Sequence, residues 1–124
     1  MIVGGGFAGL NAALVLGKST RKDLRIQIID RRNHHLFQPL LYQVATAGLS
    51  PADISTPIRR ALRKCRNVQP MLGEVQAIDA ESRRLVTSCG ELQYDYLILA
   101  CGATHSYFGN NQWEERAPGL KTIE

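Results

Sequence analysis

The sequence predicts an α/β fold in which a parallel β-sheet built on a βαβ unit is joined to a small antiparallel β-meander. A short apolar segment, residues 1–3, runs directly into the glycine-rich sequence G-G-G-F-A-G at residues 4–9, and a second apolar run, residues 25–30, ends in Asp30. Between residues 74 and 94, three short β-like segments follow one another, where a simple α/β unit would have a helix. Strand, glycine turn, helix, strand and carboxylate are the parts of a Rossmann-like dinucleotide-binding unit.

The three spaced glycines have different expected roles. Gly4 allows the tight turn, Gly6 lets a pyrophosphate approach the backbone, and Gly9 lets the helix pack closely on the sheet. The start of the helix offers unpaired N–H groups and a partial positive charge to the phosphates. Asp30, which follows Gly9 by 21 residues, is placed to accept hydrogen bonds from the adenosine ribose. The alternative is a glycine-rich turn that binds no ligand.

The remaining elements follow from apolar patterning. Residues 7–17 read as a helix covered on more than one side, and residues 68–72 as the third strand. Residues 96–100 form a continuous apolar run, which is typical of a strand buried on both faces. We expect residues 31–57 to be an irregular but apolar loop that folds over either a core edge or a planar ligand.

A basic segment follows this loop. Thr56 is expected to cap a helix with Pro57 in its first position. The helix carries an apolar stripe of Ile58, Ala61, Leu62 and Cys65. The surrounding arginines and lysine then form a solvated face, and the modest net charge of +4 favours no nucleic-acid partner.

Other residue types indicate no further chemistry. Three widely spaced cysteines without a C-x-x-C pair fit small buried or half-buried hydrophobes in a reducing compartment. No acidic motif accompanies His34, His35 or His105, so we expect loop histidines without a metal. No serine lies in a nucleophile-elbow pattern, and we expect no catalytic side chain. The chain shows no signal peptide or bilayer-spanning apolar stretch, and its 124 residues suit one domain or part of one.

Three motifs together resemble the FAD-binding part of type II NADH dehydrogenases, the single-subunit NADH:quinone oxidoreductases. V-G-G-G-F-A-G-L at residues 3–10 is similar to their FAD fingerprint. F-Q-P-L-L-Y-Q-V-A-T-A-G-L-S-P at residues 37–51 resembles their flavin-side loop, and A-C-G-A-T-H-S-Y-F-G at residues 100–109 a third segment. The chain departs from the family at Cys101, where threonine is usual, and at Asp30, where glutamate is common.

The resemblance implies a set of FAD-binding positions. Residues around the pyrophosphate would be Gly4, Gly6, Phe7, Ala8 and Gly9. Asp30 would hold the ribose, with Arg31 or Arg32 along the adenine side and Val75 touching adenine through its backbone. The isoalloxazine or ribityl side would be formed by Pro39, Leu40 and Thr46. The far side of the dinucleotide would be lined by Ala100, Cys101 and Gly102.

The resemblance also implies a respiratory-chain flavoprotein that transfers electrons from NADH to a quinone through FAD without pumping protons. We expect residues 1–124 to be part of the FAD-binding domain, with a second nucleotide-binding domain and a carboxyl-terminal region absent. In the whole protein, the carboxyl-terminal region would attach peripherally to the inner, cytoplasmic face of the membrane, and a homodimer is expected.

Three alternatives remain open. One is a sulfide:quinone oxidoreductase, for which Cys101 is the suggestive residue. Another is an NADP-dependent dehydrogenase domain, which Asp30 opposes by repelling a 2′-phosphate. The third is a non-catalytic dinucleotide-binding fragment.

Overall fold

The computed structural model describes residues 1–123, which form two compact units. The first unit contains Met1–His35 and Pro57–Gly102, and the second contains Leu36–Thr56 and the residues from Ala103 onward. Each unit is described by itself.

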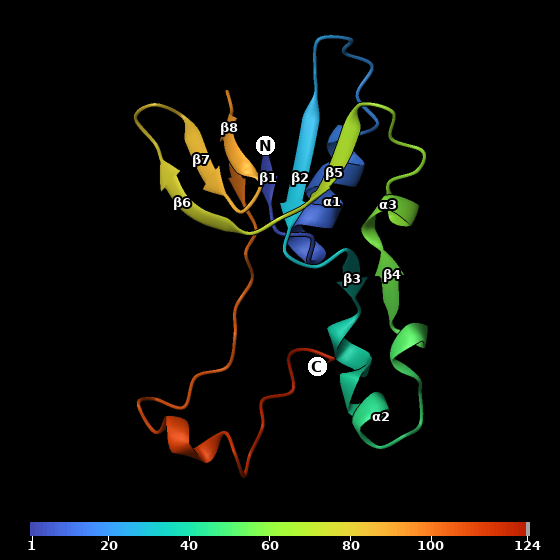
Figure 1. Ribbon diagram of the computed structural model, residues 1–124. Coiled ribbons are helices and arrows are strands. Elements are labelled where there is room, and N and C mark those ends of the chain that lie inside the picture. The colour runs from blue at the N-terminus through green and yellow to red at the C-terminus, as the bar shows by residue number, and fades with distance from the viewer. Residues whose placement is uncertain (124) are drawn as a thin grey trace. The chain divides into compact units, whose positions relative to one another are not determined.

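A four-stranded parallel sheet lies at the centre of the first unit (Figure 1). Its order is β5-β2-β1-β9, with bounds of Ile2–Val3 for β1, Ile26–Asp30 for β2, Val68–Leu72 for β5 and Ile98–Leu99 for β9. The helix α1 (Phe7–Leu16) connects β1 to β2 and ends at Gly17. The structure thus confirms the predicted βαβ unit.

The two faces of this sheet pack against different elements because side chains alternate along a strand. On one face, Ile2 and Ile28 pack with Leu10 and Ala13 of α1 in a buried cluster. The other face, with Val3 and Ile29, packs on Leu85 of the meander, and Ile29 and Leu85 are fully buried. Burial on both faces explains why β2 has two consecutive apolar residues, Ile28 and Ile29.

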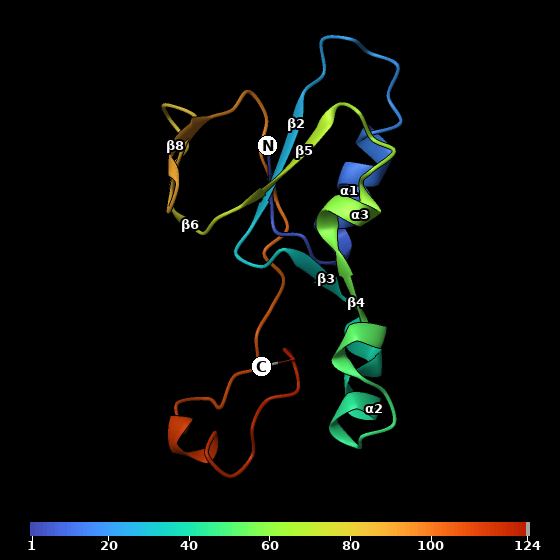
Figure 2. The same ribbon diagram turned by 45° about the vertical axis from the view of Figure 1, so that its right-hand side comes forward.

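The meander consists of β6 (Val75–Asp79), β7 (Arg84–Thr87) and β8 (Gly90–Gln93), paired antiparallel in that order. This confirms the predicted β crossover between the third and fourth strands of the parallel sheet. In Figure 2, the meander lies on one side of the parallel sheet and α1 on the other.

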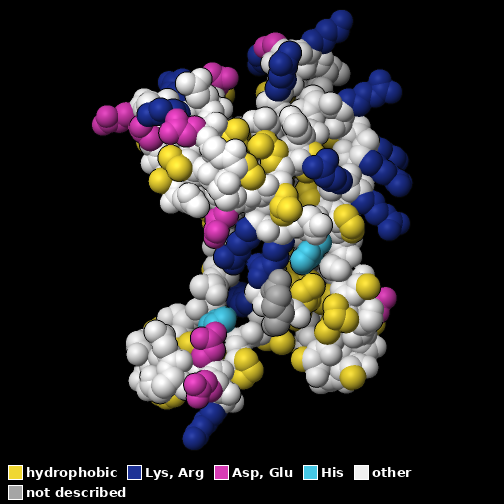
Figure 3. All heavy atoms as spheres, viewed as in Figure 1, with side chains coloured by type: hydrophobic (Ala, Val, Ile, Leu, Met, Phe, Trp, Pro, Cys, Tyr) yellow, Lys and Arg dark blue, Asp and Glu magenta, His cyan; other side chains and the backbone are white. Residues whose placement is uncertain are grey.

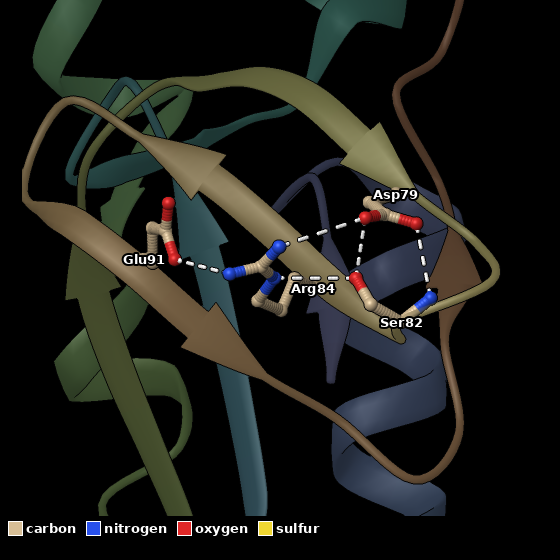
Figure 4. A network of polar contacts seen from close by, with 4 residues as sticks. All are labelled: Asp79, Ser82, Arg84 and Glu91. Carbon is tan, nitrogen blue, oxygen red and sulfur yellow. Dashed lines mark hydrogen bonds and ion pairs between the residues drawn. The ribbon is translucent and has the colours of Figure 1, made fainter.

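A polar network holds the turn between β6 and β7 (Figure 4). Asp79 accepts hydrogen bonds from the Ser82 hydroxyl and, at 3.0 Å, from the Ser82 N–H. Arg84 lies 3.8 Å from Asp79 and 3.0 Å from Glu91. The bonds from Ser82, together with the charge of Arg84, hold the pKa of Asp79 below its ordinary value.

The basic helix is shorter than predicted. The helix α3 spans only Ile58–Ala61, and Thr56 belongs to the strand β4 (Ser55–Pro57), so Thr56 does not cap it. The predicted apolar stripe is nevertheless correct, since Ile58, Leu62 and Cys65 are buried and Ala61 packs against them. The chain after α3 continues in hydrogen-bonded turns, from Leu62 N–H to the Ile58 carbonyl and from Cys65 N–H to the Leu62 carbonyl, which keep the stripe on one side.

The prediction that residues 96–100 form a strand buried on both faces is wrong. Only Ile98–Leu99 is a strand, and Leu99 is 60% exposed. The physical reason is its place in the sheet: among residues 1–123, β9 pairs only with β1 and is an edge strand.

Residues 34–57 contain more regular structure than the predicted loop. They form β3 (His34–Leu36), a 3₁₀ turn at Gln38–Leu40, α2 (Leu41–Ala45), a 3₁₀ turn at Pro51–Asp53, and β4. Strands β3 and β4 pair in a two-stranded sheet. A further 3₁₀ turn lies at Asn111–Trp113. No helix within residues 1–123 has the length and apolar character needed to cross a bilayer.

Candidate dinucleotide site

The turn between β1 and α1 is built so closely that two of its glycines cannot be replaced without a clash. Gly4 has a φ of +102°, and a Cβ added there would lie 2.2 Å from the Ala100 carbonyl oxygen. A Cβ at Gly9 would lie 1.8 Å from the Gly4 carbonyl oxygen. These contacts confirm the roles predicted for Gly4 in the turn and Gly9 in the close packing of the helix.

Gly6 differs from the other two glycines because nothing lies within 4 Å of the position of an added Cβ. It precedes α1 with a φ of −70°, and Gly6, Phe7 and Ala8 are all exposed. Within residues 1–123, the Gly6 N–H has no hydrogen-bond partner. Open space beside the Gly6 amide at a helix N-terminus fits a bound phosphate group.

Asp30 holds the glycine turn in place. One carboxylate oxygen accepts a hydrogen bond of 2.5 Å from the Gly5 N–H, and the other accepts one of 2.8 Å from the Arg32 N–H. Each oxygen keeps a second lone pair, so the predicted contact with ribose hydroxyls is compatible with this arrangement. No pattern in the sequence predicts the bond between Asp30 and the turn.

His35 of β3 is a second residue that contacts the turn without any signal in the sequence. Its Nδ1 lies 3.1 Å from the Gly5 carbonyl oxygen, and its ring packs edge-on against Phe7 with centroids 4.9 Å apart. The contact joins residues 30 positions apart, so no local spacing could have revealed it.

The carboxyl ends of β2 and β5 border a small cavity of about 30 Å³. It is lined by Arg32 and Asn33, by Ile58 and Arg59 at the start of α3, and by residues 70–72. This volume suits about one water molecule, so a larger group would need side chains to move. Arg31 is exposed and lies 4.0 Å from Glu74. Val75 is half-buried at the start of β6.

The end of β9 brings another group of predicted site residues to the turn. Ala100 is buried, and its N–H donates to the Val3 carbonyl at 2.8 Å. Gly102 has a φ of +72° and open space around it, and Cys101 is exposed. Cys89 is exposed as well, so burial was correctly predicted only for Cys65.

Three predicted site residues belong to the second unit. Pro39 is exposed, Leu40 is half-buried, and Thr46 follows α2 with its hydroxyl bonded at 3.0 Å to the Tyr42 carbonyl. The structure therefore brings the predicted residues next to β1, α1, β2 and β9 together in the first unit. Pro39, Leu40 and Thr46 lie in the second unit.

Basic side chains gather on the α3 side of the first unit (Figure 3). The residues are all exposed: Arg59, Arg60, Arg63, Lys64 and Arg66. They project away from the buried stripe, as expected for a solvated face.

A parallel sheet with a glycine turn, an exposed helix start and a carboxylate after the second strand defines a dinucleotide-binding protein of the α/β class. The sequence profile of the pyridine nucleotide-disulphide oxidoreductases matches residues 1–124, and the chain belongs to that family.

Curated relatives narrow the comparison. The chain is 49% identical over 128 residues to the type II NADH:quinone oxidoreductase Ndh of Mycobacterium tuberculosis, and 47% identical to NdhA of the same organism. Each alignment covers 100% of this chain but 27% of the relative, so the chain spans about a quarter of their length.

Solved structures show the same fold. The sulfide:quinone oxidoreductase of Aquifex aeolicus matches 91% of this chain and 26% of its own, with a TM-score of 0.78 and 28% identity. NDH2 from Plasmodium falciparum, solved in complex with NADH, matches 92% of this chain and 24% of its own, with a TM-score of 0.77 and 26% identity.

Proposed function

We propose that the chain is the FAD-binding part of a type II NADH:quinone oxidoreductase. The observation that carries the proposal is Gly6, where open space and a free amide meet at the start of α1. The substrates are inferred from the two mycobacterial relatives, which are named NADH:quinone oxidoreductases and align with the whole chain.

The chain's own residues would bind and orient the cofactor. Amides of residues 6–9 would donate to its pyrophosphate, and the spare lone pairs of Asp30 would accept from the ribose. Arg31, Arg32 and the Val75 backbone would lie on the adenine side, with Ala100, Cys101 and Gly102 on the far side. The flavin side is assigned to Pro39, Leu40 and Thr46 by resemblance. When bound, FAD supplies the redox centre that accepts a hydride from NADH and delivers two electrons to a quinone.

Partners and location are part of the same proposal. NADH and a quinone are the substrates of the whole protein. Because quinones are lipid-soluble, the whole protein would work at the inner, cytoplasmic face of the membrane, attached peripherally. A homodimer is also proposed.

The test compares the 124-residue chain with the product of the complete reading frame that contains it. We expect that product to quench FAD fluorescence stoichiometrically and to reduce a quinone with NADH. The isolated chain would bind FAD weakly or not at all. Each missing hydrogen bond to a charged group weakens binding by roughly ten- to a hundredfold. Tight binding and NADH:quinone turnover by the chain alone would refute this division. A whole protein that binds no FAD would refute the function.

Sulfide:quinone oxidation is a second candidate because two observations favour it. The Aquifex aeolicus structure is as similar in fold as NDH2, and Cys101 is exposed at the end of β9. Replacing Cys101 by serine would abolish sulfide-dependent flavin reduction if this candidate is correct. NADH-dependent reduction unaffected by the replacement would support the first candidate instead.

A further inference from the structure

We infer that His35 is a positioning residue for the pyrophosphate-binding turn: it holds the Gly5 carbonyl and thereby directs the Gly6 N–H towards the phosphates. The inference rests on the proposed binding of a dinucleotide at this turn. Its starting point is the distance of 3.1 Å between His35 Nδ1 and the Gly5 carbonyl oxygen. Because a carbonyl oxygen only accepts, His35 must donate through Nδ1–H.

The peptide bond between Gly5 and Gly6 transmits this contact. In a trans peptide, the carbonyl of one residue and the N–H of the next point in opposite directions. The chain contains no cis peptide bond among residues 1–123. Holding the Gly5 carbonyl against His35 therefore turns the Gly6 N–H to the opposite side of the peptide, away from His35.

A glycine pair needs such a restraint more than other residues do. Glycine has no Cβ and loses the most conformational freedom on folding, so an unrestrained Gly5–Gly6 peptide could rotate. Three neighbours limit this rotation at Gly5. Its N–H donates to Asp30, and its carbonyl accepts from His35. Ile58 packs against its Cα, since the Ile58 Cδ1 lies 2.4 Å from the position of an added Cβ.

His35 is itself held in position. Its ring meets the Phe7 ring at 87°, an edge-on contact of the kind that aromatic pairs favour. Phe7 is the first residue of α1, so the contact joins the imidazole to the helix whose amides face the phosphates. His35 thus connects β3 to both ends of the Gly5–Phe7 segment.

The test uses the protein from the complete reading frame, freed of cofactor, with the variants His35→Leu and His35→Asn. Leucine removes the donor but keeps an apolar side chain against Phe7. Asparagine keeps a donor, since its Nδ2 is separated from Cα by the same two atoms as the histidine Nδ1. The matched control is His34→Asn on the same strand, because within residues 1–123 His34 makes no hydrogen bond to the turn.

The measurements are the dissociation constants of FAD, ADP and adenosine, and the unfolding midpoint of each cofactor-free variant. We expect His35→Leu to weaken FAD and ADP by the same factor, about threefold to tenfold for one hydrogen bond, and to leave adenosine unchanged. His35→Asn should restore most of the affinity. His34→Asn should stay within about twofold of the wild type.

The outcomes separate this inference from the proposed function. Equal weakening of ADP and adenosine, or a leucine variant that binds ADP like the wild type, would overturn the role of His35. If the wild type binds ADP in a His35-dependent manner but does not bind FAD, the role of His35 stands and the flavin assignment fails. If it binds neither ligand, both are refuted.

Discussion

Replacement by alanine is expected to affect Gly9 and Gly6 differently: at Gly9 it should destabilise the fold, and at Gly6 it should weaken ligand binding. At Gly9, alanine would place its Cβ 1.8 Å from the Gly4 carbonyl oxygen and 3.3 Å from the Ala100 Cβ. The first neighbour is backbone, so the helix or the turn must shift by more than about 1 Å. At Gly6, alanine meets nothing within 4 Å, and the φ of −70° suits any residue.

The magnitudes follow from these contacts. Overpacking of this kind costs about 1–3 kcal/mol, and the better helix propensity of alanine offsets at most about 1 kcal/mol. We therefore expect Gly9→Ala to lower the free energy of unfolding by about 1–2 kcal/mol. Gly6→Ala should lower it less, by about 0.5–1 kcal/mol, because alanine is a poorer N-cap than glycine but meets no neighbouring atom here.

The affinity for FAD should be more sensitive to the substitution at Gly6 than the stability of the fold is. A methyl group at Gly6 would occupy the space proposed for the pyrophosphate, so FAD affinity should fall by at least about tenfold, equivalent to about 1.4 kcal/mol. The assays are chemical unfolding of the cofactor-free protein followed by circular dichroism, and FAD titration by fluorescence quenching. The reasoning would be refuted if Gly6→Ala bound FAD normally, or if Gly9→Ala were as stable as the wild type.

Three further substitutions test other contacts. Replacing Asp30 by asparagine places an NH₂ group opposite one of the two backbone N–H groups that the carboxylate accepts. The free energy of unfolding should therefore fall by about 1–3 kcal/mol, and FAD binding should weaken. An unchanged unfolding curve in urea would contradict this. Gly17→Ala should destabilise by about 1–3 kcal/mol in the same assay, because its Cβ would lie 2.6 Å from the Cys65 Sγ, 2.7 Å from the Cys65 Cβ and 2.8 Å from the Ala13 carbonyl oxygen. Cys65→Ala removes only the sulfur, so it should not restore the stability of Gly17→Ala. The pKa of Asp79 is lowered in the folded chain from 3.8, chiefly by Ser82, so its contribution to stability is complete above about pH 4 and disappears as pH falls through the lowered value. Unfolding midpoints of wild type and Asp79→Asn should therefore converge with acidification, and a constant difference between pH 2 and pH 6 would show that the ionisation of Asp79 does not contribute to stability.

Local patterns predicted much of the fold correctly. The apolar run of residues 7–17 after the glycine turn indicated α1, and the β-rich segments after residue 74 indicated the meander. Both signals are contained in neighbouring residues, and their packing agrees with their intrinsic preferences. The apolar stripe of Ile58, Leu62 and Cys65 was also visible, although the helix that carries its start ends at Ala61.

Long-range packing explains the failures. The apolar run of residues 96–100 has the composition of a buried strand, but burial depends on what lies on each side, and β9 pairs only with β1 within residues 1–123. The exposure of Cys89 and Cys101 has the same cause, because a cysteine carries no local signal of its surroundings.

The order of residues by itself determined the βαβ unit, its three glycines and the acid after the second strand. Each is a local requirement: a turn with positive φ, a helix start with free amides, a strand end with a carboxylate. Only the tertiary structure decided that Asp30 binds the Gly5 N–H and that His35 binds the Gly5 carbonyl. These contacts join residues 25 and 30 positions apart, so they depend on how the strands are placed and not on any spacing along the chain.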